Sequence, residues 1–271
     1  MIATGVIFLL GAFAGFNQND FMYATAPIFL NELKLYQELG FLQAPGSIFA
    51  YGLLYNVVDG ANFHFALRTF SLALLLLSSL LIYRCAVVVA GRLPACFSLL
   101  FIFTSVYVLS IGREIGNTPL ALFFLSAALC IYYGRPLDVR SAALIGFCIG
   151  LSATGKLNFA LYAVPFGLFL AAKFGLRSRE TCAYMIGGIV GSSLIWYYLF
   201  LDFSHFWFFN IRFHGLMNLH RQTTGWQPLL SVAVATLNFL LQSNPALYLI
   251  IRASGLTQTR EERRQFLEVG I

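Results

Sequence analysis

The chain has 271 residues, of which 59% are hydrophobic and only 10% are charged, and its mean hydropathy is +0.78. Because a soluble domain has about a quarter of its residues charged, this composition excludes an ordinary water-soluble globular protein and predicts a surface that faces lipid. The formal net charge of +6 does not indicate a nucleic-acid partner, since most basic residues lie in short loops between apolar runs, where membrane topology explains them. The five cysteines have no C-x-x-C pair or metal-ligand spacing and resemble small hydrophobic residues.

Apolar runs follow one another along the chain and predict an all-α, polytopic transmembrane bundle of about eight spans. The first run, residues 1–16, lacks the basic start and the cleavage site of a signal peptide, so we expect an uncleaved first span. A span needs about 20 helical residues, so the shortest runs must extend into their flanks or lie inside the protein. The later runs are 66–90, 94–111, 118–133, 141–155, 157–173, 183–201 and 228–251.

The segment between the first two runs, residues 17–65, is too apolar to be a plain loop. Residues 21–39 and 45–58 both suit helices that lie in the membrane interface. Treating 45–58 as a span would invert every later loop and move the basic residues to the outside. We therefore expect an outer loop that contains two juxtamembrane helices.

The basic residues test this topology. With the N-terminus in the cytoplasm, eleven of the 17 Lys and Arg residues fall on the inner side, as the positive-inside rule requires. The six outer ones are spread over five loops. The inner set is Arg84, Arg92, Arg135, Arg140, Lys173, Arg177, Arg179, Arg252, Arg260, Arg263 and Arg264.

The whole chain is predicted to form a single membrane domain of a bacterial inner or plasma membrane. Its expected parts are a first span (1–16), an outer juxtamembrane loop (17–65), a helical bundle (66–201), an outer loop (202–227), a last span (228–251) and a cytoplasmic tail (252–271).

All eleven acidic residues lie in loops or at the ends of spans. An ion-coupled transporter usually carries an ionisable group near the bilayer midplane, and this sequence shows none there. The outer loops, by contrast, combine carboxylates, cations, aromatic residues and histidines at membrane level. This pattern favours chemistry on a membrane-borne substrate at the outer face.

Five short segments, in order along the chain, resemble elements of the GT-C superfamily of polyprenyl-phosphate-sugar-dependent glycosyltransferases, which includes protein O-mannosyltransferases and aminoarabinose transferases. We call them the motif segments. They are Asn19-Asp20-Phe21-Met22-Tyr23; Tyr36-Gln37-Glu38 with Gln43-Ala44-Pro45; Gly60 with Ala66-Leu67-Arg68; Asn117-Thr118-Pro119-Leu120; and Gly150-Leu151-Ser152-Ala153-Thr154-Gly155-Lys156. The family's Asp-Glu pair appears here as Asn19-Asp20, and its later Asp as Asn117. The chain is also much shorter than typical members.

The resemblance implies transfer of a sugar from a polyprenyl-phosphate donor to a lipid, glycan or protein acceptor on the extracytoplasmic face. Such a donor has a good leaving group, so inverting transfer needs one general base and cationic or amide groups around the departing phosphate. Asp20 is the candidate base, or else an N-cap of a helix starting near Phe21. Lys156 is the candidate phosphate partner, or else a snorkelling interfacial lysine.

Other candidate substrate-binding residues are Arg113, Asn117, Glu38, Arg212 and His214. Arg113 has the alternative of pairing with Glu114, Glu38 that of a solvent-facing carboxylate, and Arg68 is expected to be an interfacial anchor. The outer histidines match no common zinc spacing, so no metal site is assigned. The aromatic residues from Phe206 to Phe209, with Trp226, are expected to form an interfacial belt. Gly187, Gly188 and Gly191 suggest a close helix-packing face.

Two other functions stay open at this stage. The first is a transporter or flippase of lipid-linked substrates, which would predict inverted repeats and a charged central cavity. The second is a truncated, inactive GT-C relative, suggested by Asn19 and Asn117 at two expected acidic positions. No cofactor is expected, and the sequence leaves open whether a divalent ion takes part.

Overall fold

The computed structural model describes residues 18–58, 60–104, 115–213 and 216. This part of the chain is helical and has no β-strand, only an isolated bridge between Leu35 and Leu39. The elements are α2 (Gln18–Ile28), η1 (Phe29–Asn31), α3 (Gly46–Tyr55), η2 (Gly60–Asn62), α4 (Phe63–Ala90), α5 (Arg92–Thr104), α7 (Thr118–Gly134), α8 (Val139–Gly155), η3 (Leu157–Tyr162), α9 (Ala163–Phe174), α10 (Arg179–Gly191), α11 (Ser193–Leu201), α12 (Phe203–Trp207) and the π-helical turn η4 (Phe208–Arg212).

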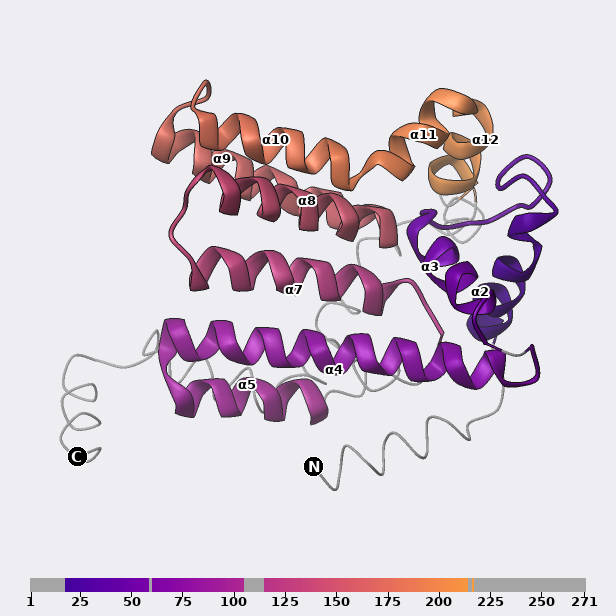
Figure 1. Cartoon of the computed structure of the whole chain (residues 1–271), viewed down its shortest axis with the longest axis horizontal. Coiled ribbons are helices and arrows are strands. Elements are labelled where there is room, and N and C mark those ends of the chain that lie inside the picture. Colours follow the sequence, from indigo (N-terminus) through magenta and orange to yellow (C-terminus); the bar gives the residue numbers. More distant parts are fainter. Residues whose placement is uncertain (1–17, 59, 105–114, 214–215, 217–271) are drawn as a thin grey trace, which may run out of the picture.

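The long helices form a row in which α5, α4, α7, α8 and α10 pack side by side in that order (Figure 1). Helices that follow each other along the chain run in opposite directions, so their connections alternate between two ends of the row, whereas the neighbours α4 and α7 run parallel, as do α8 and α10 (Figure 1). We call one end the site end: it holds α2 and α3, the starts of α4 and α7, and the ends of α8 and α11 (Figure 1). The turns around residues 91, 135–138 and 175–178 lie at the opposite end.

By length and composition, two helical segments can cross a membrane: Phe63–Ala90 and Leu157–Phe174. A third span exists if the bent pair α10 and α11 crosses as one unit. Helices α3, α7 and α8 are apolar but have 10, 17 and 17 residues, fewer than the roughly 20 needed to cross the hydrocarbon. The described part therefore supports two or three of the eight predicted spans, and the runs 1–16 and 228–251 lie outside it.

The predicted span 183–201 is not one straight helix. Helices α10 and α11 meet at an angle of 61°. At the break, the hydroxyl of Ser192 donates a hydrogen bond to the Gly188 carbonyl (2.7 Å) and accepts one from the indole N–H of Trp196 (3.0 Å). A Gly-Ser stretch of this kind is a common cause of sharp kinks. The hydropathy of the sequence does not change across this stretch, so hydropathy alone does not predict the kink.

Glycine lets α8 and α10 approach closely, as the sequence predicted for Gly187 and Gly191. A Cβ atom on Gly187 would lie 2.1 Å from the Ala143 carbonyl oxygen, and one on Gly191 would lie 2.2 Å from that of Phe147. The facing Gly146 would place its Cβ 2.0 Å from the Tyr184 carbonyl oxygen. Backbone meets backbone along this contact, so only glycine fits these positions.

The loops that the sequence assigns to one membrane side lie together at one end of the row. The turns carrying Arg92, Arg135, Arg140, Lys173, Arg177 and Arg179 are at the opposite end, away from α2 and α3 (Figure 1). Their helices are capped there: Asp138 and Ser141 form a capping box on α8, and Ser178 caps α10. Gly91 and Gly175, with φ of 87° and 96°, end α4 and α9.

The segment between the first two apolar runs contains the two predicted helices, with different limits. The first begins by Gln18, not near Phe21, so Asp20 lies in its first turn and not at its N-cap. It ends at Ile28, next to Pro27, and the chain then turns back through residues 32–45 to reach α3. Both helices pack on α4 over an aromatic core that includes Tyr23, Phe41 and Tyr51. This core fixes the polar groups of the site end.

Candidate functional site

An ion pair between α2 and α4 lies at the centre of the site end. The Asp20 carboxylate accepts a hydrogen bond from the Arg68 guanidinium at 2.5 Å, and the two side chains are 0% and 4% exposed. The second carboxylate oxygen accepts the backbone N–H of Ile115 at 2.6 Å. Buried charges of this kind are tolerated only when each is paired and hydrogen-bonded.

Neither Arg68 nor Asp20 has the surroundings that its expected role requires. Arg68 is not an interfacial anchor, because its side chain is buried and bonded to Asp20. The Asp20 carboxylate has no exposed oxygen on which an acceptor hydroxyl can be placed. A general base must lie within hydrogen-bond reach of the proton that it takes. In this arrangement Asp20 connects three segments of the chain: α2, α4 and the segment at Ile115.

The segment 115–118, before α7, is held by a second contact from α3. The Tyr51 hydroxyl donates to the Gly116 carbonyl at 2.5 Å and lies 3.0 Å from the hydroxyl of Ser71 on α4. Tyr51 is fully buried, and this burial raises its pKa to about 12. It is therefore a neutral hydrogen-bonding group that fixes the entry into α7.

Asn117 faces the first outer loop. Its side-chain amide donates to the Gln43 side-chain oxygen at 2.8 Å, and the Tyr36 hydroxyl donates to the Gln43 carbonyl at 2.7 Å. Asn117 is 5% exposed. Asn117, a candidate substrate-binding residue from the sequence, thus holds the turn at Gln43, just before α3.

Lys156 stands where α8 ends, beside the start of α7. Its ammonium group donates to the Thr118 hydroxyl at 3.1 Å. The side chain is half-buried, and this burial lowers the pKa of Lys156 below its ordinary value. Within the described residues Lys156 makes no ion pair, since the ion pairs found there join Arg68 to Asp20 and His205 to Asp202.

The motif segments all meet at the site end. The first contacts the third through Asp20 and Arg68, and the second contacts the fourth through Gln43 and Asn117. The fourth contacts the fifth through Thr118 and Lys156. The second and fifth also touch, since a Cβ on Gly46, the residue after Pro45, would lie 2.6 Å from the Thr154 hydroxyl oxygen. Segments up to about 130 residues apart in sequence therefore form one cluster.

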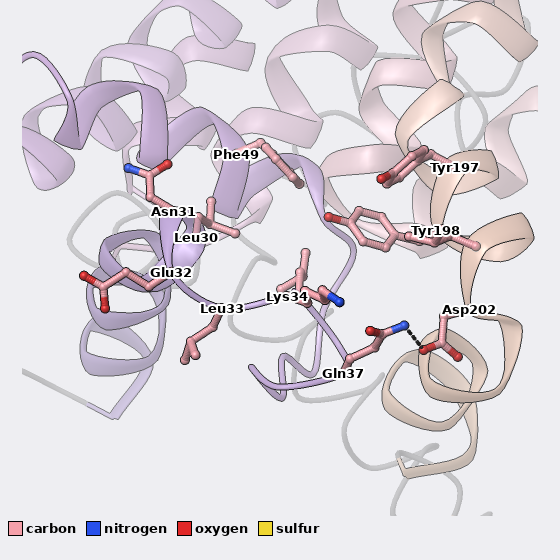
Figure 2. A pocket seen from close by; sticks show the side chains of 12 residues that line it. Leu30, Asn31, Glu32, Leu33, Lys34, Gln37, Phe49, Tyr197, Tyr198 and Asp202 are labelled. Carbon is pink, nitrogen blue, oxygen red and sulfur yellow. Dashed lines mark hydrogen bonds between the residues drawn. The ribbon is translucent and has the colours of Figure 1, made fainter.

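A cavity of about 490 Å³ lies beside this cluster, between residues 30–37 and α11 (Figure 2). At its edge the Gln37 side-chain amide donates to the Asp202 carboxylate at 2.7 Å. The same carboxylate caps α12 and lies 2.8 Å from the Nδ1 atom of His205. The hydrogen bond with the His205 side chain is the main cause that lowers the pKa of Asp202 to about 2, so this carboxylate is ionised at neutral pH.

Comparison of the chain with models of protein families, with curated proteins and with solved structures finds no match. The geometry of the site end and the resemblance of the motif segments are therefore the observations that bear on function.

The remaining candidate residues lie away from the cluster or outside the described part. Glu38 is exposed, and its carboxylate accepts the backbone N–H of Lys34 at 2.8 Å, closing a turn of its own loop. Arg212 is exposed on the turn η4. Arg113 and His214 are outside the described residues. Of the expected belt, Trp207 and Phe208 are exposed, whereas Phe206 is buried and Phe209 stacks on Tyr36.

Three residues of the cluster had no role in catalysis or substrate binding assigned from the sequence: Arg68, Gln43 and Thr118. The burial of Arg68 had a signal, because it lies one turn into a long apolar run, where a cation needs an anion nearby. Gln43 and Thr118 belong to motif segments but carry no charge, and their partners are 74 and 38 residues away. Among the described residues, no group of three or more His, Cys, Asp and Glu side chains is placed to bind a metal ion.

Proposed function

We propose that this chain is a membrane glycosyltransferase that takes a sugar from a polyprenyl-phosphate carrier and that Lys156 binds the carrier's phosphate at the site end. The observation that supports this proposal is a half-buried ammonium group with no carboxylate partner in the described part of the chain. Partial burial disfavours a cation unless an anion accompanies it. A phosphate supplied by the lipid would be that anion.

The start of α7 adds to this attraction. Its first residues, Thr118 and Pro119, follow Asn117 directly, and Asn117 makes no side-chain cap on the helix. The N-terminus of a 17-residue helix carries partial positive charge and unpaired N–H groups, which favour a nearby anion. The Lys156 ammonium lies 3.1 Å from the side-chain hydroxyl of Thr118, the first residue of this helix. Ammonium, hydroxyl and helix terminus therefore converge on one anion-binding niche.

The chemistry of transfer fits this niche. In the proposed step, the acceptor oxygen forms a bond to the anomeric carbon while the bond from that carbon to the phosphate oxygen breaks. The electron pair stays on the leaving phosphate, where Lys156 and the helix terminus stabilise the added charge. The acceptor proton passes to the leaving phosphate, which departs as the singly protonated polyprenyl phosphate, and not to Asp20, whose carboxylate is enclosed by Arg68 and Ile115. We give Asp20 the role of positioning the segment that leads into α7.

One specific observation favours a second candidate. Asp20, the candidate base, and Asn117, which stands at an expected acidic position, both make internal contacts. A protein that binds a lipid phosphate without transferring its sugar would show the same contacts. This candidate differs from the first in one respect: it predicts binding of the carrier without turnover.

The test is release of polyprenyl phosphate from a polyprenyl-phosphate sugar by the full chain in lipid nanodiscs, with a mixture of lipid-linked and peptide acceptors. Lys156→Gln is expected to lower release by about 100-fold, the loss typical of removing one stabilising donor to a developing anion. Lys173→Gln is the matched control, because Lys173 is an exposed lysine near the opposite end of the row. Equal release by all three proteins contradicts the role of Lys156, and no release by wild type contradicts transfer.

A further inference from the structure

The cavity beside the motif segments has the lining of a ligand site. Its volume of about 490 Å³ lies in the range of roughly 300–1,000 Å³ typical of small-molecule pockets. The segment 30–37 forms one wall, Phe49 of α3 lies at the back, and α11 forms the other wall (Figure 2). The segments on the two sides are more than 150 residues apart in sequence, so the cavity exists only in the folded chain.

Aromatic rings and planar polar groups face each other across this space. Figure 2 shows Tyr197 and Tyr198 projecting from α11 toward the segment that carries Lys34. Tyr197 is 57% exposed, so a ring face is open to a ligand. On the opposite wall the Gln37 amide donates to Asp202, and the Asn31 amide donates to Asn56. The side-chain carbonyl oxygens of Gln37 and Asn31 remain as hydrogen-bond acceptors. A pyranose ring has an apolar C–H face and polar hydroxyl groups at its edge. An aromatic surface beside several fixed polar groups therefore suits such a ligand.

The charges of the lining select among such ligands. Two carboxylates, on Glu32 and Asp202, oppose one ammonium, on Lys34. Asp202 is fixed by Gln37 and His205 and stays ionised at neutral pH. When His205 beside Asp202 is neutral, the lining carries one surplus negative charge, which repels an anionic ligand and admits a neutral or amine-bearing one. Lys156, which would meet the phosphate, is not among the residues of this lining.

The cavity also has aromatic surroundings of the kind that is typical of a membrane surface. Exposed aromatic side chains follow each other along α11 and α12 next to it, and rings of this kind gather at the boundary between lipid and water. They are Trp196, Tyr197, Phe200, Phe203 and Trp207. A sugar attached to a membrane lipid is likewise presented at the boundary between lipid and water.

From these observations we infer that the cavity between residues 30–37 and α11 binds a neutral or amine-bearing saccharide. Its use as the acceptor subsite rests on the proposed function, whereas saccharide binding itself does not. Tyr197 would stack on the sugar ring, and Asp202 with Gln37 would accept and donate hydrogen bonds to its hydroxyl groups. The phosphate niche at Lys156 and this cavity then serve different parts of the reaction.

Saturation-transfer NMR on the full chain in lipid nanodiscs tests the inference, with methyl glucoside, methyl glucosaminide and glucuronate as probes. Transfer to the first two is expected, with signals about fivefold weaker for glucuronate. Tyr197→Ala and Asp202→Asn should each lower the signals of the first two by about fivefold. Asp202→Asn keeps the cap on α12, because Asn and Asp are equally good N-caps.

Tyr133→Ala is the control, since Tyr133 is a similarly exposed tyrosine near the opposite end of α7. Signals that are the same in all variants, or glucuronate signals as strong as the glucoside signals, would overturn the inference. The two proposals also fail separately. A saccharide signal without release of polyprenyl phosphate contradicts the proposed function alone, and release without a saccharide signal contradicts this inference alone.

Discussion

Gly187→Ala is expected to destabilise the chain by about 2–3 kcal/mol, although alanine favours helix over glycine by about 1 kcal/mol. The added Cβ would lie 2.1 Å from the Ala143 carbonyl oxygen and 3.0 Å from the backbone nitrogen of Phe147. Both atoms belong to the backbone of α8 and cannot rotate away. The two helices must therefore separate along their whole glycine contact. The steric term exceeds the gain in helix propensity.

The measurement is the midpoint of thermal unfolding in one detergent, where we expect a fall of roughly 5–10 °C. Gly167→Ala is the matched control inside α9, because its Cβ would lie 3.4 Å from a Tyr184 ring carbon, an ordinary contact. That variant should unfold at the wild-type temperature or slightly above it. If the two variants shift the midpoint equally, α8 and α10 are not packed as described.

Asp20→Asn is expected to cost about 3–5 kcal/mol, the loss typical of removing one partner of a buried ion pair. The asparagine still offers an oxygen to the Ile115 N–H, so the change removes mainly the charge that faces Arg68. The guanidinium is then left buried without its carboxylate. Arg68→Gln should cost a similar amount for the same reason. Thermal unfolding and the yield of folded protein in detergent report both losses.

The double variant Asp20→Asn/Arg68→Gln separates a positioning role from a catalytic one. Both side chains are then neutral and can still bond to each other, so we expect it to be more stable than either single variant. If Asp20 positions the segment 115–118, the double variant recovers release of polyprenyl phosphate together with stability. Recovery of the fold without any recovery of release would instead assign Asp20 to the chemistry. Additive losses in stability would show that the pair is not coupled.

Hydropathy and glycine spacing were sufficient to predict the helical row. The run 66–90 became α4, Phe63–Ala90, and the runs 118–133 and 141–155 became α7 and α8 with ends shifted by one or two residues. The Gly187–Gly191 face packs as predicted. These features are local: they depend on the apolar character of one run or on small residues within one helix. The limits of α10 and α11 were missed because the bend at Ser192 comes from a hydroxyl that competes for a backbone carbonyl.

The site was predictable only in part. The motif segments lie together, so the resemblance selected residues that are near in space. The role of each residue could not be predicted from the resemblance, because the burial of a side chain depends on the segments that pack over it. Asp20 is covered by Arg68 of α4 and by Ile115, which are 48 and 95 residues further along the chain. The cavity had no signal in the sequence, since Gln37 and Asp202 are 165 residues apart.

Binding of the carrier lipid tests the central claim, that the ammonium at the end of α8 holds a lipid phosphate. Native mass spectrometry of the full chain, released from detergent with an added polyprenyl phosphate, measures how much lipid is retained by wild type, Lys156→Gln and Lys173→Gln. We expect equal retention by wild type and Lys173→Gln, and retention about tenfold lower in Lys156→Gln, as the loss of one charged hydrogen bond predicts. Equal retention by all three proteins would contradict the account.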